Sequence, residues 1–377
     1  MAKQKMGKVA VLDKIGGKFE VKEYPVPKPG PGQMVIKQAR CGICGTDIHM
    51  YHGHMPGIVY PIVLGHEFVG WIEELGEGVT QDYVGKPLKK GDLVIVPPGV
   101  TDYHDFFSVI AHTATTSTST FAYGFSADAD KVTHFDGGYG EYVFLHDKRT
   151  NVLKTELPPE IAALTEPFCV GVHAALRAKY KLGDTVVIQG TGAVGLFCQL
   201  AAKMAGAGRI INVGGPSKTR MDMAKKFGAD VCINITEVKD AKERVKMVKA
   251  ETRLGLGADV VVEASGFPPA IPEGLDMLRT SGTFCEVGHF TDVGPTTINP
   301  FFQLCNKNVD LQGVWGDDLE HFVRILPMIE QRAFPYEDLI THTVGLNELN
   351  KAILFPAQGY KLDGREVTKV MVDGSKY

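Results

Sequence analysis

The chain has 377 residues, of which 44% are hydrophobic and 22% charged, and its formal net charge is −4. This length predicts two or three domains, the composition excludes disorder over most of the chain, and the charge balance gives no reason to expect a nucleic acid or an anionic membrane as a partner. The seven cysteines are odd in number and scattered, which excludes a disulfide scaffold, whereas the 43 glycines exceed ordinary usage.

The N-terminal segment MAKQKMGKVAVLDKIGG has neither the apolar stretch nor the cleavage site of a secretory signal. The most apolar stretch, Val186–Ala207, is interrupted by Gln189, Gln199 and Lys203 and does not predict a membrane span. We therefore expect a cytoplasmic protein with reduced cysteines.

Short strands joined by glycine and proline turns are predicted for the first part of the chain. Gly7–Leu12 and Met34–Cys41 are β-rich, prolines between positions 25 and 31 exclude a helix there, and Leu93–Val96 follows a turn and ends at a proline. This pattern predicts an irregular β-barrel with few helices. The polar segment Thr101–Asp136 is too long for an ordinary connection and is either a surface loop or a lobe that shapes a pocket or a subunit contact.

Strands alternate with helices after Glu160, which predicts a parallel sheet with crossover helices. The expected strands are Thr185–Gln189, Arg209–Val213, Asp259–Glu263, Thr283–Val287, Leu311–Trp315 and, near the C-terminus, Val367–Val372. The expected helices are Ala193–Ala205, Arg220–Phe227 and Asp318–Gln331.

A dinucleotide-binding loop is predicted in the run G-T-G-A-V-G that starts at Gly190, between a predicted strand and a predicted helix. Gly190 would allow the tight turn, Gly192 would let the backbone approach a pyrophosphate, and Gly195 would permit close helix–sheet packing. The phosphates would lie at the helix N-terminus, and Val194 is counted with the glycines as a cofactor-binding residue. The alternative is a glycine-rich turn that binds no ligand.

The choice between NAD and NADP depends on the end of the next strand. NAD-binding loops usually have an acidic residue about 20 positions further on, but there is none between Thr191 and Met221. Small residues there leave room for a 2′-phosphate, and Lys218 and Arg220 could pair with its charge. The sequence therefore slightly favours NADP(H) over NAD(H); the alternative is that both bases are solvated and NAD binds without the carboxylate.

Three polar clusters outside this loop contain candidate metal ligands: the run C-G-T-D-I-H from Cys44, the run G-H-E from Gly65, and the Glu166-Pro167 pair. Taken singly, Cys44 could be a small buried side chain, His66 a core histidine and Glu166 a carboxylate at a helix start. Cysteine and histidine together suit Zn²⁺, and three protein ligands leave the open fourth position that catalysis requires.

Together these clusters resemble the zinc-dependent medium-chain alcohol and polyol dehydrogenases, most of all sorbitol- and threonine-dehydrogenase-like members. The most specific element is G-H-E-F-V-G at Gly65–Gly70, followed at the family spacing by Gly76 and Val79, and the resemblance extends from about residue 7 to the C-terminus. It implies a GroES-like catalytic β-barrel domain over residues 1–166 and 317–377 and a Rossmann doubly wound parallel-sheet domain over residues 167–316. It also implies a homodimer or homotetramer.

The resemblance implies a role for each matching residue. Cys44 and His66 would be zinc ligands, Glu166 would occupy the third ligand position, and Glu67 would be either a ligand or a second carboxylate beside the metal. Asp47 would accept a hydrogen bond from the far ring nitrogen of His66 and so fix its tautomer.

The implied reaction is the reversible oxidation of a secondary alcohol or polyol with NAD(P). Thr46 and His49 would relay the proton with the help of the cofactor ribose, and Glu67 is counted with them as catalytic. Two alternatives are a zinc-free enone or quinone reductase of the same superfamily and a non-catalytic nucleotide-binding protein.

One departure from the family concerns the structural zinc that some members hold with four closely spaced cysteines. This chain has no cysteine between Cys44 and Cys169, and His104, His112 and His134 are too widely spaced to replace such a site. We therefore expect one catalytic zinc per subunit.

Overall fold

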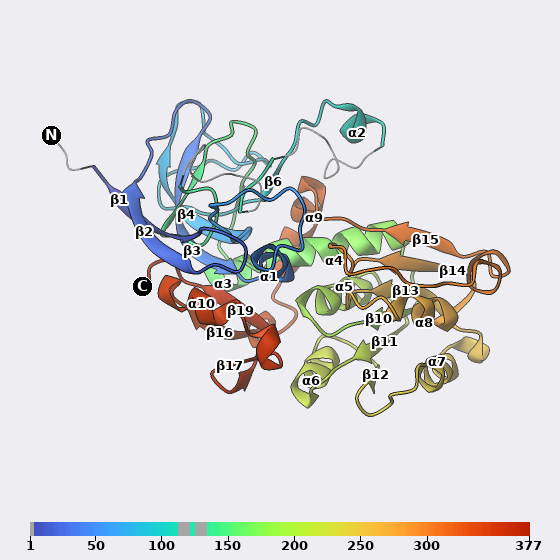
Figure 1. Cartoon of the computed structure of the whole chain (residues 1–377). Helices are drawn as coiled ribbons and strands as arrows, with labels where there is room; N and C mark the ends of the chain where they lie inside the picture. Colours follow the sequence, from blue (N-terminus) through green and yellow to red (C-terminus); the bar gives the residue numbers. More distant parts are fainter. Residues whose placement is uncertain (1–3, 112–120, 125–133) are drawn as a thin grey trace. The chain divides into compact units, whose positions relative to one another are not determined.

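The structure is a computed structural model that describes residues 4–111, 121–124 and 134–377, and it contains two compact units (Figure 1). The β-rich unit comprises Met1–Glu166, Asp317–Gln331 and Ile340–Tyr377. The α/β unit comprises Pro167–Gly316 and Arg332–Leu339. Each unit has a core of its own.

The β-rich unit is built on a sheet of strand order β16-β19-β3-β4-β5-β9, and β8 also pairs with β3. The strands of this unit are β1 (Met6–Leu12), β2 (Phe19–Pro25), β3 (Met34–Gly42), β4 (Glu67–Leu75), β5 (Leu93–Ile95), β6 (Gly99–Val100), β7 (Phe121–Ala122), β8 (Tyr142–Leu145), β9 (Leu153–Lys154), β16 (Ile340–Val344), β17 (Lys361–Leu362), β18 (Arg365–Glu366) and β19 (Lys369–Val372). Its helices are α1 (Gly45–Tyr51), α2 (Phe106–Val109), α3 (Pro159–Ala162), α9 (Leu319–Glu330) and α10 (Leu349–Ala352), with short 3₁₀ turns at Leu346–Glu348 and Pro356–Gln358.

The core of this unit joins the two ends of the chain. Val9, Ile36, Phe68 and Val370 come from β1, β3, β4 and β19 and lie in one buried cluster. Because successive side chains of a strand point to opposite faces, each of these strands contributes its apolar face to that cluster. β19 pairs antiparallel with the end of β3, which brings the last strand of the chain beside the segment that leads to Cys44.

The α/β unit contains a parallel sheet of strand order β12-β11-β10-β13-β14-β15. Its strands are β10 (Thr185–Gln189), β11 (Arg209–Gly214), β12 (Val231–Asn234), β13 (Ala258–Glu263), β14 (Leu278–Glu286) and β15 (Asp310–Gly313). Its helices are α4 (Thr165–Ala178, whose first two residues belong to the β-rich unit), α5 (Ala193–Met204), α6 (Lys218–Lys226), α7 (Ala241–Ala250) and α8 (Ala270–Met277), with shorter turns at Arg253–Gly255, Pro300–Cys305 and Tyr336–Leu339.

Helices cover both faces of the parallel sheet (Figure 1). Ala174 of α4 and Cys198 of α5 pack on one face, and Leu275 of α8 packs with Phe284 on the other. Strands that are buried on both faces need apolar residues throughout, which explains the uninterrupted run Val186–Ile188. The predicted parallel sheet with crossover helices is confirmed.

The order of the strands reverses at β10, which pairs with β11 on one side and with β13 on the other. Open α/β sheets bind ligands outside the carboxyl ends of their strands at such a point. Gln189, the last residue of β10, is in register with Glu263, the last residue of β13. Gly190 follows directly, so the predicted dinucleotide loop lies at this position in the sheet.

The segment 332–339 packs with the α/β unit, whereas the sequence places it with residues 317–377. Its Phe334 and Tyr336 rings lie against Phe227, with ring centroids 6.4 Å away in both cases. Packing between segments that are distant in the sequence leaves no mark on local residue patterns, and this explains the difference.

Parts of the segment Thr101–Asp136 are described. They include α2 and β7, whereas His112 lies outside the described residues. The His134 ring stacks on Tyr24 with centroids 3.6 Å apart. The function of this segment stays a prediction. Among the described residues, no helix is long and apolar enough to cross a membrane.

Candidate active site

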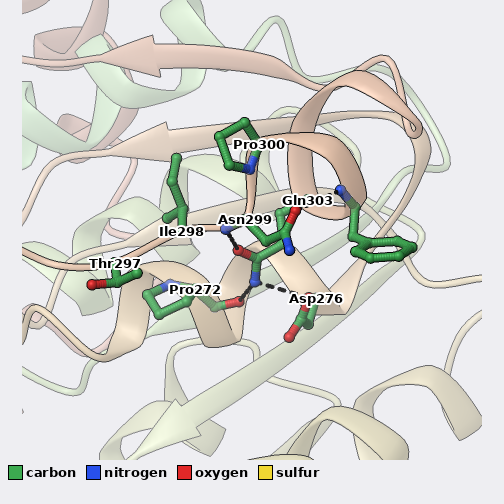
Figure 2. Close-up of a pocket in the computed structure, with 8 residues that line it drawn as sticks. Pro272, Asp276, Thr297, Ile298, Asn299, Pro300 and Gln303 are labelled. Carbon is green, nitrogen blue, oxygen red and sulfur yellow. Dashed lines mark hydrogen bonds between the residues drawn. The ribbon is translucent and has the colours of Figure 1, made fainter.

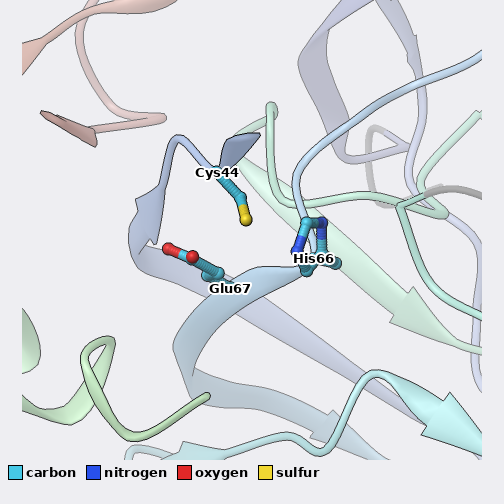
Figure 3. Close-up of side chains that lie close together, drawn as sticks. All are labelled: Cys44, His66 and Glu67. Atoms are coloured by element: carbon cyan, nitrogen blue, oxygen red, sulfur yellow. The ribbon is translucent and has the colours of Figure 1, made fainter. Parts of the chain in front are cut away.

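The β-rich unit brings Cys44, His66 and Glu67 together (Figure 3). Cys44 precedes the first turn of α1, and Glu67 begins β4 directly after His66. The register between β3 and β4 pairs Gly42 with Glu67, so the strand end that leads to Cys44 lies beside the start of β4. One potential ligand atom from each of the three side chains lies within 4.8 Å of the others.

Both ring nitrogens of His66 face carboxylates. Its Nδ1 is 3.6 Å from Oδ1 of Asp47, and its Nε2 is 3.9 Å from Oε1 of Glu166. Burial alone would lower the pKa of His66, but Asp47, Cys44 and Glu166 outweigh burial and raise the pKa well above its ordinary value. The two ring nitrogens therefore have different neighbours: Nδ1 faces Asp47, and Nε2 faces Glu166.

Asp47 is fully buried and is held by two hydrogen bonds. The backbone N–H of Cys44 donates to its Oδ2 at 2.8 Å, and the hydroxyl of Tyr139 donates to the same oxygen at 2.9 Å. The first bond closes a capping box at the start of α1 and fixes the backbone of Cys44. Tyr139 was not expected from the sequence, because it is 92 positions from Asp47 and no local pattern connects them.

Glu67 has a partner that the sequence did not reveal. Its side chain is fully buried and forms an ion pair with Lys369, which is itself 3% exposed and donates to the carbonyl oxygen of Ile43 at 3.2 Å. A Cβ at Gly42 would lie 1.8 Å from Oε2 of Glu67, so glycine is required beside this carboxylate. Among the described residues, Oε1 of Glu67 has no hydrogen-bond partner. A lysine within the apolar strand V-T-K-V-M-V was the one available sign of a buried ion pair.

Glu166 lies in the first turn of α4, beyond the compact group of three. Burial and the charge of Glu67 raise its pKa to about 7, although His66 acts in the opposite direction. Burial and the charge of Glu166 also raise the pKa of Asp317 well above its ordinary value, and Oδ2 of Asp317 has no hydrogen-bond partner in the described part of the chain. The site therefore contains more carboxylates than the sequence indicated.

Thr46 and His49 lie on α1, directly after Cys44 in the chain. The Sγ–H of Cys44 donates toward the hydroxyl oxygen of Thr46 at 3.6 Å. His49 is partly buried, and its Nδ1 lies 3.2 Å from Nδ1 of His54. Burial, followed by the neighbouring His54 and His52, lowers the pKa of His49.

The donors of this group fit a zinc ion. A thiol, an imidazole and a carboxylate are the ligand types that Zn²⁺ takes in catalytic sites, where three protein ligands leave one position open. Cys44, His66 and Glu67 supply these three types within a single cluster, and the unpartnered Oε1 of Glu67 is a buried oxygen that a cation would satisfy.

The glycine loop in the α/β unit has the backbone geometry of a tight turn. Gly190 has φ +123°, and a Cβ there would meet the carbonyl oxygen of Ala264 at 2.9 Å. A Cβ at Gly195 would lie 2.6 Å from the carbonyl oxygen of Gly190. In contrast, a Cβ at Gly192, which precedes the first turn of α5, would meet no atom within 4 Å. Val194 is partly buried and packs against the core of the α/β unit.

Lys218 and Arg220 differ in their relation to this loop. Arg220 is buried and donates from Nη1 to the carbonyl oxygen of Thr191 at 3.4 Å. Lys218 is 88% exposed and pairs with Asp222 at 2.5 Å. The structure therefore brings only Arg220 to the glycine loop.

A second group of possible ligands lies at the carboxyl ends of β13 and β14, where Glu263, Glu286 and His289 also approach within 4.8 Å. Glu263 is used there by the adjoining loop, since it accepts hydrogen bonds from the backbone N–H groups of Ser265 at 2.7 Å and Gly266 at 3.2 Å. Burial and the charge of Glu286 raise the pKa of Glu263 to about 7. These contacts give Glu263 a structural task, and no ligand is assigned to this group.

A pocket of about 580 Å³ lies elsewhere in the α/β unit (Figure 2). Gln303 spans it, donating to the carbonyl oxygen of Pro272 at 3.1 Å and to Asp276 at 3.0 Å. None of the candidate metal or cofactor residues lines this pocket. It is therefore not the site that the sequence predicts.

Two family models match the chain. Residues 30–157 match the alcohol dehydrogenase GroES-like domain, and residues 193–331 match the zinc-binding dehydrogenase domain. Among curated proteins, a sorbitol dehydrogenase from Halalkalibacterium halodurans is 33% identical over 89% of this chain and 92% of its own length. A 5-exo-hydroxycamphor dehydrogenase from Pseudomonas putida is 32% identical with the same coverage of both chains.

Solved structures give the same result for the fold. An alcohol dehydrogenase from Thermotoga maritima superposes with a TM-score of 0.90 at 30% identity and covers 98% of this chain and 99% of its own. A zinc-binding dehydrogenase from Sinorhizobium meliloti, solved with NADP bound, superposes with a TM-score of 0.83 at 25% identity and covers 98% of this chain and 100% of its own. The expected combination of a GroES-like domain and a Rossmann domain is confirmed.

Proposed function

Because this chain belongs to the zinc-binding medium-chain alcohol and polyol dehydrogenase family, we propose that it transfers a hydride reversibly between a secondary alcohol or polyol and NAD(P). The observation that carries the proposal is the convergence of Cys44, His66 and Glu67 in a chain that also has a glycine loop at the switch point of a parallel sheet. The first arrangement suits a metal ion, and the second suits a dinucleotide.

Cys44, His66 and Glu67 would hold one zinc ion per chain, and the carboxylate of Glu166 lies 3.9 Å from Nε2 of His66. The metal, when bound, polarises the alcohol oxygen and lowers the pKa of the hydroxyl group. Asp47 faces Nδ1 of His66, which would leave Nε2 for the metal, and Lys369 offsets the charge of Glu67 in its buried surroundings. The resemblance to the family implies Glu166 as the third zinc ligand, whereas the close approach of Glu67 to Cys44 and His66 favours Glu67.

Thr46 and His49 would carry the proton of the substrate hydroxyl toward solvent. They are three positions apart on α1, and such residues lie on one face of a helix. The lowered pKa of His49 keeps its ring neutral and able to accept a proton at neutral pH. Gly190, Gly192, Val194 and Gly195 would bind the cofactor, whose pyrophosphate would lie at the start of α5.

We favour NADP(H) slightly over NAD(H). The end of β11 has no acidic residue to take a ribose hydroxyl, and Arg220 lies at the glycine loop, where it could pair with a 2′-phosphate. The NADP-bound relative from Sinorhizobium meliloti is consistent with this preference. Lys218 contributes less than expected, because it already pairs with Asp222.

The names of the relatives suggest sorbitol-like polyols and cyclic secondary alcohols as substrate classes. A panel of polyols, secondary alcohols, amino alcohols and aldehydes, assayed with both cofactors beside a zinc determination, tests the proposal. Zinc-dependent oxidation of a polyol or secondary alcohol is the expected result. Reduction of enones by metal-free protein, or cofactor binding without any turnover, would replace the proposal by one of its two alternatives.

We also propose a homodimer or homotetramer. β15 is an edge strand in the described sheet, and its Leu311 is 53% exposed. Phe301 and Phe302, in the turn that precedes it, are 61% and 63% exposed. An open strand edge with apolar side chains favours pairing with another chain. The cytoplasmic location stays a prediction of the sequence.

A further inference from the structure

Three histidines, His49, His52 and His54, lie together where α1 ends. The turn that joins them is fixed by its backbone, because the N–H of His54 donates to the carbonyl oxygen of His49 at 2.9 Å. Gly53 has φ +76°, a conformation that side chains rarely adopt, and thus lets the chain fold back. His54 is held beside His49 as a result.

The Nδ1 atoms of His49 and His54 are 3.2 Å apart, which is a hydrogen-bond distance. A neutral imidazole carries one hydrogen, at either Nδ1 or Nε2, so one Nδ1 must donate and the other must accept. When His54 accepts, His49 has its hydrogen at Nδ1 and a lone pair at Nε2. When His54 donates, His49 has its hydrogen at Nε2.

The two rings of the pair differ in their exposure to solvent. His49 is partly buried and His54 is exposed, and the His52 ring stacks on His54 with centroids 5.7 Å apart. The neighbouring segment contributes the uncharged side chain of Ile15 against Gly53. Burial, then His54 and His52, lowers the pKa of His49, so the His49 ring is available in its neutral form near pH 7.

We propose that His54 is a positioning residue that couples its own tautomer to that of His49, so that a proton taken up at Nε2 of His49 leads to the release of one from Nε2 of His54. This rests on the proposed function, in which His49 takes up the proton released from the alcohol. The hydrogen bond between the two rings is its geometric basis.

During alcohol oxidation one proton enters the pair at His49 and one leaves it at His54. Nε2 of His49 accepts the incoming proton while its Nδ1–H passes to Nδ1 of His54. His54 then releases its own Nε2–H to water, and both rings are neutral again. The hydrogens now lie on Nε2 of His49 and Nδ1 of His54, which is the arrangement that can donate a proton to the substrate in the reverse, reducing direction.

Three variants separate this role from a structural one. His54→Leu removes the hydrogen bond, His54→Asn retains a polar atom at the position of Nδ1, and His52→Ala removes the stacked neighbour but leaves the Nδ1 pair. The zinc-loaded full-length protein, labelled with ¹⁵N-histidine, is examined by long-range ¹H–¹⁵N spectra across pH, and kcat for oxidation and reduction is measured across the same range.

In His54→Leu we expect mixed tautomers at His49, an upward shift of its titration midpoint and a loss of kcat on the order of tenfold, because a positioned proton acceptor contributes at least that much. His54→Asn can accept the hydrogen bond from Nδ1 of His49 but cannot release a proton, so it should keep a single His49 tautomer without restoring kcat. His52→Ala should keep the His49 tautomer. An unchanged His49 tautomer in His54→Leu would overturn the proposal even if the enzyme is active. A locked tautomer in a protein that oxidises no alcohol would instead refute the proposed function.

Discussion

Replacing Lys369 by methionine removes the positive partner of a buried carboxylate. Lys369 and Glu67 are 3% and 0% exposed, so Glu67 would be left as an uncompensated charge inside the β-rich unit. The removal of one partner of a buried ion pair costs about 3–5 kcal/mol of the free energy of unfolding, and the lost hydrogen bond to the carbonyl oxygen of Ile43 adds to it. We expect this loss in the metal-free protein and a smaller loss in the zinc-loaded protein, because a cation held by Glu67 would replace the missing charge.

Urea unfolding of wild type and Lys369→Met, each with zinc and with a chelator, measures both values. The matched control is Lys226→Met, which removes one partner of an exposed pair with Asp338 and should cost less than about 1 kcal/mol. The double variant Glu67→Gln with Lys369→Met removes the unpaired charge as well and should recover much of the stability of the metal-free protein. Equal losses in Lys369→Met and Lys226→Met, or a loss that zinc leaves unchanged, would refute this account of Glu67.

Three further predictions concern the α/β unit. Gly195→Val places side-chain atoms 2.6 Å from the carbonyl oxygen of Gly190 and should weaken dinucleotide binding at least about tenfold. Fluorescence titration measures the affinity, and an unchanged affinity would contradict this role of Gly195. Arg220→Gln should lower the preference for NADPH over NADH about tenfold in kcat/KM; an unaltered ratio would exclude Arg220 from phosphate recognition. Because the pKa of Glu263 is raised from 4.5 to about 7, the folded state holds its proton more tightly, and the free energy of unfolding should fall as pH rises through this range. Glu263→Gln should make that dependence shallower, as urea unfolding at pH 5 and pH 8 would show.

The elements that the sequence predicts well have strong local patterns. Val186–Ile188 is apolar throughout because both faces of the parallel sheet are covered, and the helix after Gly192 follows from its apolar spacing. Boundaries are less accurate. α6 starts at Lys218, two positions before the predicted start, because the side chain of Ser217 accepts a hydrogen bond from the Arg220 N–H at 3.3 Å and caps the helix.

The candidate site is predictable in its residue types but not in its contacts. Cys44, His66 and Glu67 belong to short runs that can be recognised in the chain. The partners Tyr139 and Lys369 reach the site through packing between segments far apart in the sequence, so no local pattern could assign them. The choice between Glu67 and Glu166 as third ligand was open in the sequence for the same reason, because it depends on distances between different elements.

Zinc content measured together with turnover in wild type and Cys44→Ser tests whether Cys44 holds a zinc ion on which turnover depends. We expect one zinc per chain and zinc-dependent oxidation of a secondary alcohol or polyol in the wild type. Cys44→Ser should lose both the metal and turnover while keeping its affinity for the dinucleotide, since the glycine loop lies in the other unit. Full turnover in a metal-free Cys44→Ser protein would contradict this role of Cys44.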